Sequence, residues 1–148
     1  MWGYPNGMRG KNLSNIYKSI ETIKRYVIKY RYDGEKLFEK LSGIKGLGLS
    51  TITKILYFFQ IKCGNQYIPI LDSHVINSMD FFEDFDGVHQ NNRGWIFIKE
   101  TAAIFNGVDG IKYDDLEYYL FELDKKWEKH IKEFKREQLE TLTRELIP

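Results

Sequence analysis

The chain has 148 residues, 43% of them hydrophobic and 16% aromatic, which is typical of a folded domain with a buried core and excludes a disordered chain. The one cysteine, Cys63, excludes an internal disulfide and a four-thiolate zinc or iron–sulfur site. No run approaches the roughly 20 apolar residues that cross a bilayer, and the N-terminus lacks the basic and apolar segments of a secretory signal. We therefore expect a cytoplasmic protein without membrane contact.

The net charge of +1 hides a segregation of charge along the chain. Residues 1–62 contain 12 Lys/Arg and 4 Asp/Glu, whereas residues 63–124 contain 3 Lys/Arg and 12 Asp/Glu. A basic block of this density indicates an anionic partner, most commonly nucleic acid. The alternative is that the two blocks pair across the fold and cancel, and charge alone does not decide between these readings.

Hydrophobic periodicity predicts three helices in the first half of the chain. Residues 1–12, rich in Gly, Pro and Asn, are expected to form an irregular arm. The first helix starts at Ser14 and carries an apolar stripe: Ile16, Ile20, Ile23, Val27 and Tyr30. Asp33 is a plausible N-cap for a short helix, which carries Leu37, Phe38 and Leu41. After a tight turn at 43–48, a third helix starts at residue 50 or 51 and buries Ile52, Ile55, Leu56 and Phe59.

The second half continues as helices and loops after Gly64-Asn65 ends the third helix. We expect an extended piece at 67–71, a helix at 73–82 with Phe82 facing inward, a polar loop at 83–94, a helix at 95–106 and a long helix at 114–146. Residues 95–98 could instead form a strand, and Asp114 would cap the long helix. The long helix carries the apolar residues Leu116, Tyr119, Leu120, Leu123, Trp127, Ile131 and Phe134. The prediction is an all-α helical bundle that forms one domain over 1–148.

The most informative stretch is residues 44–51, Ile-Lys-Gly-Leu-Gly-Leu-Ser-Thr, between two amphipathic helices. Gly46 and Gly48 allow backbone angles and close approaches that a β-carbon would prevent, and Leu47 can pack between the helices. The N–H groups that open the second helix would then point outward and bind a phosphate oxygen, aided by the helix dipole. The alternative is an ordinary tight turn. The apolar spacing on both sides favours a helix-hairpin-helix DNA-binding element at 35–60.

Two motifs make the chain resemble the helix-hairpin-helix DNA glycosylase superfamily, which includes endonuclease III, adenine DNA glycosylase and 8-oxoguanine DNA glycosylase. The family has a Leu-Pro-Gly-Val-Gly hairpin with Lys or Ser two residues on, and later an apolar residue, Asp, a small residue, often His, and Val. Here Ile44-Lys45-Gly46-Leu47-Gly48 precedes Ser50, and Leu71-Asp72-Ser73-His74-Val75 follows. The resemblance covers about residues 35–82 and is closest to the adenine and 8-oxoguanine branches.

The resemblance implies that Asp72 is catalytic. In the family this carboxylate stabilises positive charge on the deoxyribose as the base departs and helps to activate the nucleophile, because N-glycosidic cleavage passes through an oxocarbenium-like state. The other reading is that Asp72 only caps the helix at 73–82, and the two roles are compatible. Ser50 stands where bifunctional members have a Schiff-base lysine, so the resemblance implies a monofunctional enzyme in which water attacks.

The remaining candidate residues are basic. Lys45 and Lys54 are expected to contact DNA phosphates together with Gly46, Gly48 and Ser50, although each lysine could be a solvated surface residue or supply an amine for lyase chemistry. His74 is expected to give structural support. His74, His89 and His130 lack metal-ligand spacing, so no metal or other cofactor is expected, although the hairpin could hold a monovalent cation.

The chain also departs from the family pattern. Lys45 replaces the proline before the hairpin glycine, and the four-cysteine iron–sulfur loop of several members is absent. About 34 residues precede the hairpin, where the family usually has a hundred or so, so the N-terminal half is short or missing. The missing wall of the base pocket would then come from the C-terminal helices, from an N-terminal region outside this sequence or from a protein partner. Residues that recognise the base cannot be carried over.

Three hypotheses about function follow. The first is a monofunctional glycosylase that excises a damaged or modified base from double-stranded DNA with Asp72 and water. The second is a non-catalytic helix-hairpin-helix module that grips backbone phosphates. The third is a helical protein-interaction domain. The motif around Asp72 favours the first over the second, because backbone binding does not require it, and the basic block weighs against the third.

Overall fold

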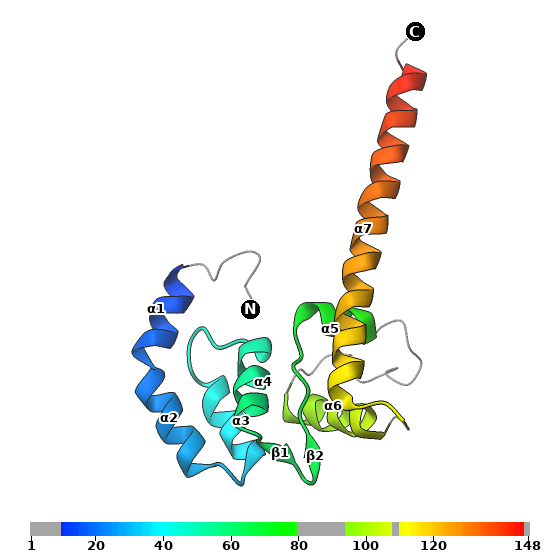
Figure 1. Cartoon of the computed structure of the whole chain (residues 1–148). Coiled ribbons are helices and arrows are strands. Elements are labelled where there is room, and N and C mark those ends of the chain that lie inside the picture. The colour runs from blue at the N-terminus through cyan, green and yellow to red at the C-terminus, as the bar shows by residue number, and fades with distance from the viewer. Residues whose placement is uncertain (1–9, 80–93, 108–109, 147–148) are drawn as a thin grey trace.

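The computed structural model describes residues 10–79, 94–107 and 110–146, and those ranges are mostly helical, with seven helices and one two-stranded sheet (Figure 1). In chain order the elements are α1 Gly10–Lys18, α2 Ile20–Lys29, α3 Gly34–Ser42, α4 Leu49–Phe58, β1 Lys62–Cys63, β2 Gln66–Tyr67, α5 Ser73–Met79, α6 Trp95–Gly107 and α7 Tyr113–Leu146. The all-α prediction is confirmed.

The N-terminal helices start earlier and are more divided than the periodicity predicted. α1 begins at Gly10, four residues before Ser14, and a break at Ser19 separates it from α2. The predicted arm is therefore too long by three residues, and its other residues, 1–9, lie outside the described part of the chain. Ile23 and Val27 are buried as expected, whereas Ile20, next to the break, is exposed.

The α3–α4 pair agrees closely with the predicted 35–60 segment. Asp33 caps α3, because its Oδ1 accepts a hydrogen bond from the Lys36 N–H at 3.0 Å. Leu37 and Leu41 on the inner face of α3 are fully buried. The prediction that Phe59 is buried is wrong: α4 ends at Phe58, so the Phe59 side chain leaves the helical phase and is 50% exposed.

Two predicted details between α4 and α5 need correction. Gly64-Asn65 does not end α4 but forms the turn of a short antiparallel hairpin, in which Lys62 pairs with Tyr67. Gly64 has a φ of 62°, which favours glycine. Of the predicted extended piece at 67–71, only Tyr67 belongs to a strand, and the rest continues to α5 without regular secondary structure.

The second half is helical, as expected. Residues 95–98 lie in α6, so the strand alternative is wrong. α7 begins at Tyr113, one residue before Asp114, so Asp114 is a first-turn residue that complements the helix dipole and not the cap. The upper part of α7 extends beyond the other helices (Figure 1), and Trp127, predicted to face inward, is 50% exposed. Phe82, residues 83–93 and the side chains of Ile131 and Phe134 lie outside what the structure describes.

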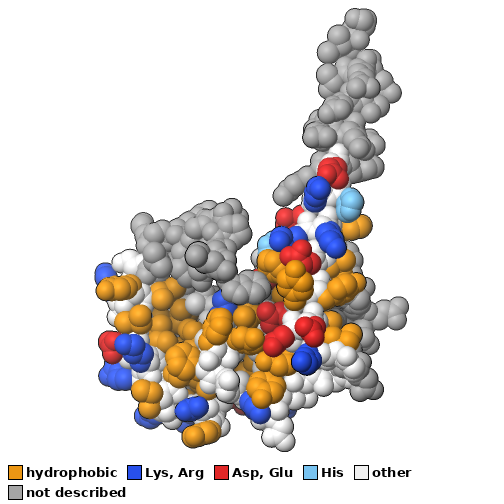
Figure 2. All heavy atoms as spheres, in the orientation of Figure 1, with side chains coloured by type: hydrophobic (Ala, Val, Ile, Leu, Met, Phe, Trp, Pro, Cys, Tyr) orange, Lys and Arg blue, Asp and Glu red, His pale blue; other side chains and the backbone are white. Residues whose placement is uncertain are grey.

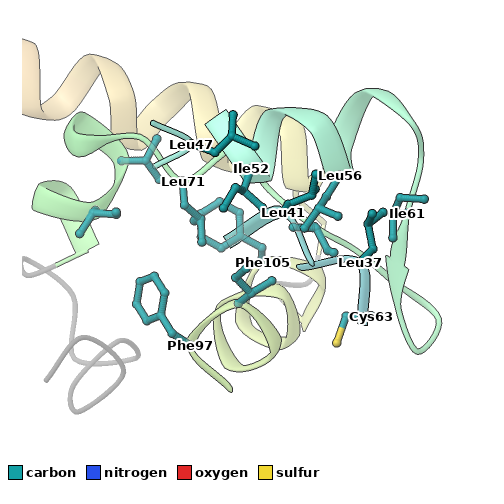
Figure 3. Packing of buried hydrophobic residues seen from close by; sticks show 14 of the residues in the cluster. Leu37, Leu41, Leu47, Ile52, Leu56, Ile61, Cys63, Leu71, Phe97 and Phe105 are labelled. Carbon is teal, nitrogen blue, oxygen red and sulfur yellow. The ribbon is translucent and has the colours of Figure 1, made fainter. Parts of the chain in front are cut away.

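One hydrophobic cluster joins helices α2 to α7. Figure 3 shows a part of this cluster. Its fully buried leucines and phenylalanines each contribute roughly 1.5–3 kcal/mol to folding. Gly34 lies at the joint between α3 and α6: a β-carbon there would lie 2.8 Å from the Trp95 ring and 2.9 Å from the Lys62 carbonyl oxygen. The packing of α3 against α6 therefore requires glycine at position 34, because any side chain there would collide with these two groups.

The two charged blocks remain distinct on the surface. Lys/Arg side chains lie along the rim formed by the N-terminal helices, and Asp/Glu side chains gather over the lower part of α7 (Figure 2). The exposed pairs Lys24–Glu21, Lys40–Glu39, Lys125–Glu122 and Lys129–Glu133 each join residues at most four positions apart. Local pairs of this kind do not cancel a basic block against an acidic one. None of the described helices has the length and apolar character needed to cross a membrane.

Candidate functional site

The turn between α3 and α4 has the geometry that the sequence predicted at Gly46 and Leu47. Gly46 has a φ of 99°, a backbone conformation that other residues rarely adopt. Leu47 follows with only 8% of its surface exposed and belongs to the core cluster (Figure 3). Its N–H donates to the Ile44 carbonyl oxygen at 3.1 Å. The turn is thus anchored by Leu47 and shaped by Gly46.

Gly48 plays a different part from Gly46. Its φ of −88° and ψ of 170° are open to any residue, and a β-carbon built on it meets nothing within 4 Å. The expectation that the fold itself requires glycine here is therefore wrong. Gly48 is the N-cap of α4 and makes no side-chain cap, so the N–H groups of Leu49 and Ser50 have neither an intrahelical acceptor nor a cap, whereas the Thr51 N–H donates to the Gly48 carbonyl oxygen. Open space lies beside them.

The two candidate lysines have different environments. Lys45 is exposed in the turn, as a phosphate contact would require. Lys54 is half-buried and its charge lowers the pKa of Glu117, a residue of α7. Lys54 is therefore within electrostatic reach of the buried Glu117, and the solvated-surface reading applies better to Lys45.

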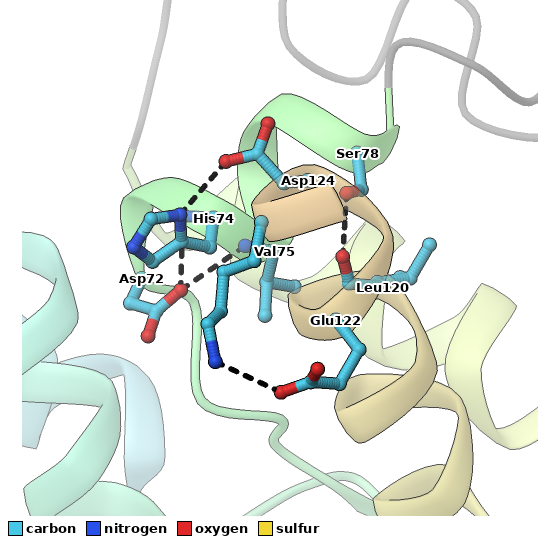
Figure 4. Close-up of polar contacts among 8 residues, drawn as sticks. Asp72, His74, Val75, Ser78, Leu120, Glu122 and Asp124 are labelled. Carbon is cyan, nitrogen blue, oxygen red and sulfur yellow. Dashed lines mark hydrogen bonds and ion pairs between the residues drawn. The ribbon is translucent and has the colours of Figure 1, made fainter. Parts of the chain in front are cut away.

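Asp72 stands immediately before α5 and caps it (Figure 4). Its Oδ1 accepts hydrogen bonds from the N–H groups of His74 and Val75, both at 3.0 Å. The side chain is half-buried, so these two bonds hold the carboxylate in one orientation while part of it stays accessible. The capping role is confirmed, and it fixes a negative charge at this position.

Side chains from three helices hold the 67–72 segment that carries Asp72. The α6 residue Asn106 bonds both to the Tyr67 N–H at 3.3 Å and to its carbonyl oxygen at 2.9 Å. Glu117 of α7 accepts from the Ile70 N–H at 2.8 Å. The hydroxyl of Thr53 in α4 accepts from the Leu71 N–H at 3.0 Å.

Thr53 connects this segment to the hairpin. Its side chain is fully buried, and besides accepting from Leu71 it donates to the Ser50 carbonyl oxygen at 3.3 Å. Ser50 lies in the first turn of α4, and Leu71 directly precedes Asp72. The Thr53 hydroxyl group therefore connects the start of α4, the candidate phosphate-binding region, to the residue before Asp72, the candidate catalytic residue.

Glu117 is a buried carboxyl group beside Asp72. Burial, helped by the negative charges of Asp114 and Asp72, raises the pKa of Glu117 from its usual 4.5 to about 7. The Ile70 N–H and the Lys54 ammonium act in the opposite direction. Near pH 7 this carboxyl group therefore exchanges a proton readily, which is typical of functional sites.

His74 has the supporting contacts that the sequence suggested. Its Nδ1 lies 2.8 Å from Asp124 Oδ2 (Figure 4). The rings of His74 and Phe121 meet edge to face, with centroids 5.0 Å apart. Both partners belong to α7, so the pair fixes the start of α5 against that helix. Ser78, later in α5, adds a hydrogen bond to the Leu120 carbonyl oxygen.

This geometry agrees with the comparison against protein families. The model of the family described as "Putative 8-oxoguanine DNA glycosylase OGG-like protein" matches residues 1–121. The chain belongs to this family. The OGG-like match includes the hairpin turn, Asp72, His74 and Glu117, and it stops before Asp124. No curated protein and no solved structure matches the chain. It is therefore a DNA-glycosylase-like protein, in agreement with the resemblance to the helix-hairpin-helix superfamily.

Sequence reasoning missed the residues that hold the site of this OGG-like chain: Thr53, Asn106, Glu117 and Asp124. One signal was present for two of them. Glu117 and Asp124 occupy the same helical phase as Leu120, at steps of three and four, and both are buried in α7. Acidic residues inside an apolar stripe are rarely buried without a partner. Thr53 and Asn106 give no comparable signal, because their partners are distant backbone groups.

Proposed function

We propose that this chain is a monofunctional DNA glycosylase that hydrolyses the N-glycosidic bond of a damaged or modified base in double-stranded DNA. The observation that carries the proposal is the fixed carboxylate of Asp72, which accepts two backbone N–H bonds at the head of α5. Thr53 links the segment that carries it to the α4 first turn. The family match supports this assignment at the level of a glycosylase-like protein.

The chemistry requires a negative charge beside the sugar. When the C1′–N bond breaks, both electrons leave with the base, and the deoxyribose carries oxocarbenium-like positive charge. A carboxylate whose position is fixed in advance stabilises that charge without reorganising during the reaction. Water then adds to C1′ and gives up a proton to Asp72 or solvent, while the departing base takes up a proton. The products are a free base and an abasic site.

Binding of the DNA backbone is assigned to the α3–α4 turn. Its support is the uncapped start of α4 at Gly48, with open space next to it, and the exposed Lys45. The N–H groups near Gly46, Gly48 and Ser50 would bind one backbone phosphate, aided by the helix dipole. Such contacts position the duplex without reading its sequence.

The absence of a lyase step follows from Ser50. A serine hydroxyl cannot form an imine with the opened sugar, whereas a lysine amine can. Lys54 and Lys45 are the amines nearest to Ser50 in sequence, and Lys54 acts electrostatically on the site. Lys54 is therefore the first residue to test for an imine with the opened sugar.

The test is excision by the purified full-length chain from duplexes that carry oxidised, deaminated, alkylated or mismatched bases, each with and without borohydride. We expect abasic products whose backbone breaks only after alkali, and no borohydride-trapped complex. Covalent trapping that disappears in Lys54→Gln would instead assign lyase chemistry. DNA binding without excision of any base would favour the non-catalytic binding module.

A further inference from the structure

Three potential metal ligands meet where α5 packs against α7. They are His74 Nδ1 at the start of α5 and the carboxylates of Asp124 and Glu128 on α7, and one ligand atom from each lies within 4.8 Å of the other two. Neither the family resemblance nor the proposed glycosidic chemistry uses such a set. The histidine spacing in the sequence did not indicate it, because the ligands come from two helices 50 positions apart.

Two of the three groups, His74 and Asp124, are held in place before any ion binds. Asp124 and Glu128 are four positions apart on α7, so their side chains lie on the same face one turn apart. The Asp124 side chain is only 6% exposed, and its Oδ2 lies 2.8 Å from His74 Nδ1. The edge of the His74 ring packs against Phe121, which fixes the direction of the ring nitrogens. Glu128 is exposed and leaves a side open to solvent.

Small movements would bring the three groups around one small ion. Donor atoms of a tetrahedral Zn²⁺ with bonds of 2.0–2.2 Å lie about 3.3–3.6 Å apart, and the donors here are separated by 2.8 Å for His74–Asp124 and by at most 4.8 Å for the other pairs. To reach these values, the His74–Asp124 contact would lengthen by about 0.5 Å and the exposed Glu128 side chain would rotate toward the pair. An imidazole nitrogen with two carboxylates favours Zn²⁺ and related transition ions over Mg²⁺ or Ca²⁺, which prefer oxygen ligands only.

We propose that His74, Asp124 and Glu128 form a binding site for one divalent transition-metal ion, with Zn²⁺ as the reference ion. Two carboxylates and a neutral imidazole carry a charge of −2, which the ion neutralises. Binding replaces the hydrogen bond between His74 and Asp124: the ring proton moves from Nδ1 to Nε2, so the imidazole stays neutral and the Nδ1 lone pair goes to the metal. Water completes the coordination on the open side.

The site adjoins Asp72 without including it. The His74 backbone N–H donates to Asp72 Oδ1, whereas the His74 ring points to α7 (Figure 4). A bound ion would therefore clamp the start of α5 to α7 and leave the Asp72 carboxylate unligated. The proposal does not depend on glycosylase activity, because metal binding is measured on the protein alone.

The experiment titrates untagged full-length protein with Zn²⁺ in competition with a chromophoric chelator, and with Co²⁺ to record its visible absorption. We expect one ion per chain and a Co²⁺ spectrum of low coordination number. Glu128→Gln, an exposed change that should not affect folding, is expected to weaken binding at least tenfold, and His74→Gln at least as much. Glu133→Gln is the matched control, because Glu133 lies on the same helix and faces Lys129 and His130 at 3.8 Å.

Two results would overturn the proposal. One is no stoichiometric binding at micromolar Zn²⁺ by the folded protein. The other is binding that Glu128→Gln and His74→Gln leave unchanged but that Glu133→Gln or His130→Gln removes, which would place the ion at the exposed end of α7. Far-UV circular dichroism of every variant distinguishes loss of a ligand from loss of the fold.

Discussion

The hairpin turn and the 67–72 segment are joined by Thr53, yet they are built in opposite ways. The turn is shaped by consecutive residues, chiefly the left-handed Gly46 and the buried Leu47. The 67–72 segment has almost no regular structure of its own, and its backbone is held by side chains 18, 39 and 47 positions away. The first region is local in sequence, and the second exists only when three helices have assembled around it.

Because of this difference, substitutions in the two regions should affect DNA binding and base excision separately. Changes in the turn should alter DNA affinity and leave stability nearly unchanged, because Gly48 and Lys45 contribute little to the core. Changes in the side chains that hold the 67–72 segment should alter stability and excision together, because the same hydrogen bonds orient Asp72 and satisfy buried backbone groups. Four measurements test this contrast, from the largest expected effect to the smallest.

Asp72→Asn should lower the excision rate by about 100- to 1000-fold, since it removes one fixed charge from the transition state. Asparagine caps a helix as well as aspartate does, so the free energy of unfolding should change little. Single-turnover excision and urea unfolding measure the two effects. Asn77→Ala, an exposed change on the same helix, is the control, and an unchanged rate in Asp72→Asn would remove this residue from the chemistry.

Stability should fall as pH rises through the range set by Glu117. The pKa of Glu117 is about 7 in the folded chain and near 4.5 when exposed, so the folded state holds the extra proton between these values. The stabilisation is complete below about pH 4.5 and is lost as pH rises toward 7, by at most about 3 kcal/mol. Glu117→Gln keeps an acceptor for the Ile70 N–H but does not titrate. Urea unfolding at several pH values should therefore show a difference between the two proteins that grows with pH; parallel profiles would contradict the assignment.

Thr53→Val should destabilise the fold by about 1–3 kcal/mol, because the buried Leu71 N–H loses its acceptor while the side-chain volume is preserved. Excision should fall as well, since Leu71 precedes Asp72, whereas DNA affinity should be retained. Thr53→Ser keeps the hydroxyl group and is the matched control. If the valine and serine variants unfold at the same urea concentration, the hydroxyl bridge does not hold the segment.

Gly48→Asp should weaken duplex binding about tenfold or more, by placing a negative charge where a phosphate is proposed to bind, and should leave stability unchanged because aspartate is a favourable N-cap. Gly48→Asn is nearly the same size as Gly48→Asp and is uncharged, so the pair separates the effect of charge from the effect of bulk.

DNA affinity should also depend on salt. With two phosphate contacts, wild-type affinity should fall about tenfold between 50 and 200 mM salt, and the affinity of Gly48→Asp should fall less steeply. Equal duplex affinity of Gly48→Asp and Gly48→Asn, or an affinity that does not change with salt, would contradict phosphate binding by the α3–α4 turn.

The same contrast explains what the sequence could predict. Helix positions, the α3–α4 turn and the capping role of Asp72 depend on residues at most a few positions apart, and they were predicted correctly to within a few residues. The break at Ser19 and the β1–β2 pair were missed. In α7 the predicted stripe included Tyr119 and Trp127, but the inward face contains Glu117 and Asp124.

The error in α7 has a physical cause. A periodicity argument assigns apolar residues to the interior and acids to solvent. Two acids are buried here because one accepts a hydrogen bond from the Ile70 N–H and the other pairs with His74. Ile70 lies 47 positions from Glu117, and His74 lies 50 positions from Asp124. A pattern of neighbouring residues therefore could not identify the partners of these two acids.

The close approach at Gly34 constrains how this sequence can vary. The Trp95 ring and the Lys62 carbonyl oxygen occupy the space of any side chain at position 34 from two directions, and a backbone oxygen cannot rotate away as a flexible side chain would. Asp33-Gly34 looks like a turn signal, yet glycine is required there by packing and not by a backbone angle. In a library that randomises position 34, we therefore expect selection for folded protein to return glycine almost alone, while alanine and serine at Gly48 survive.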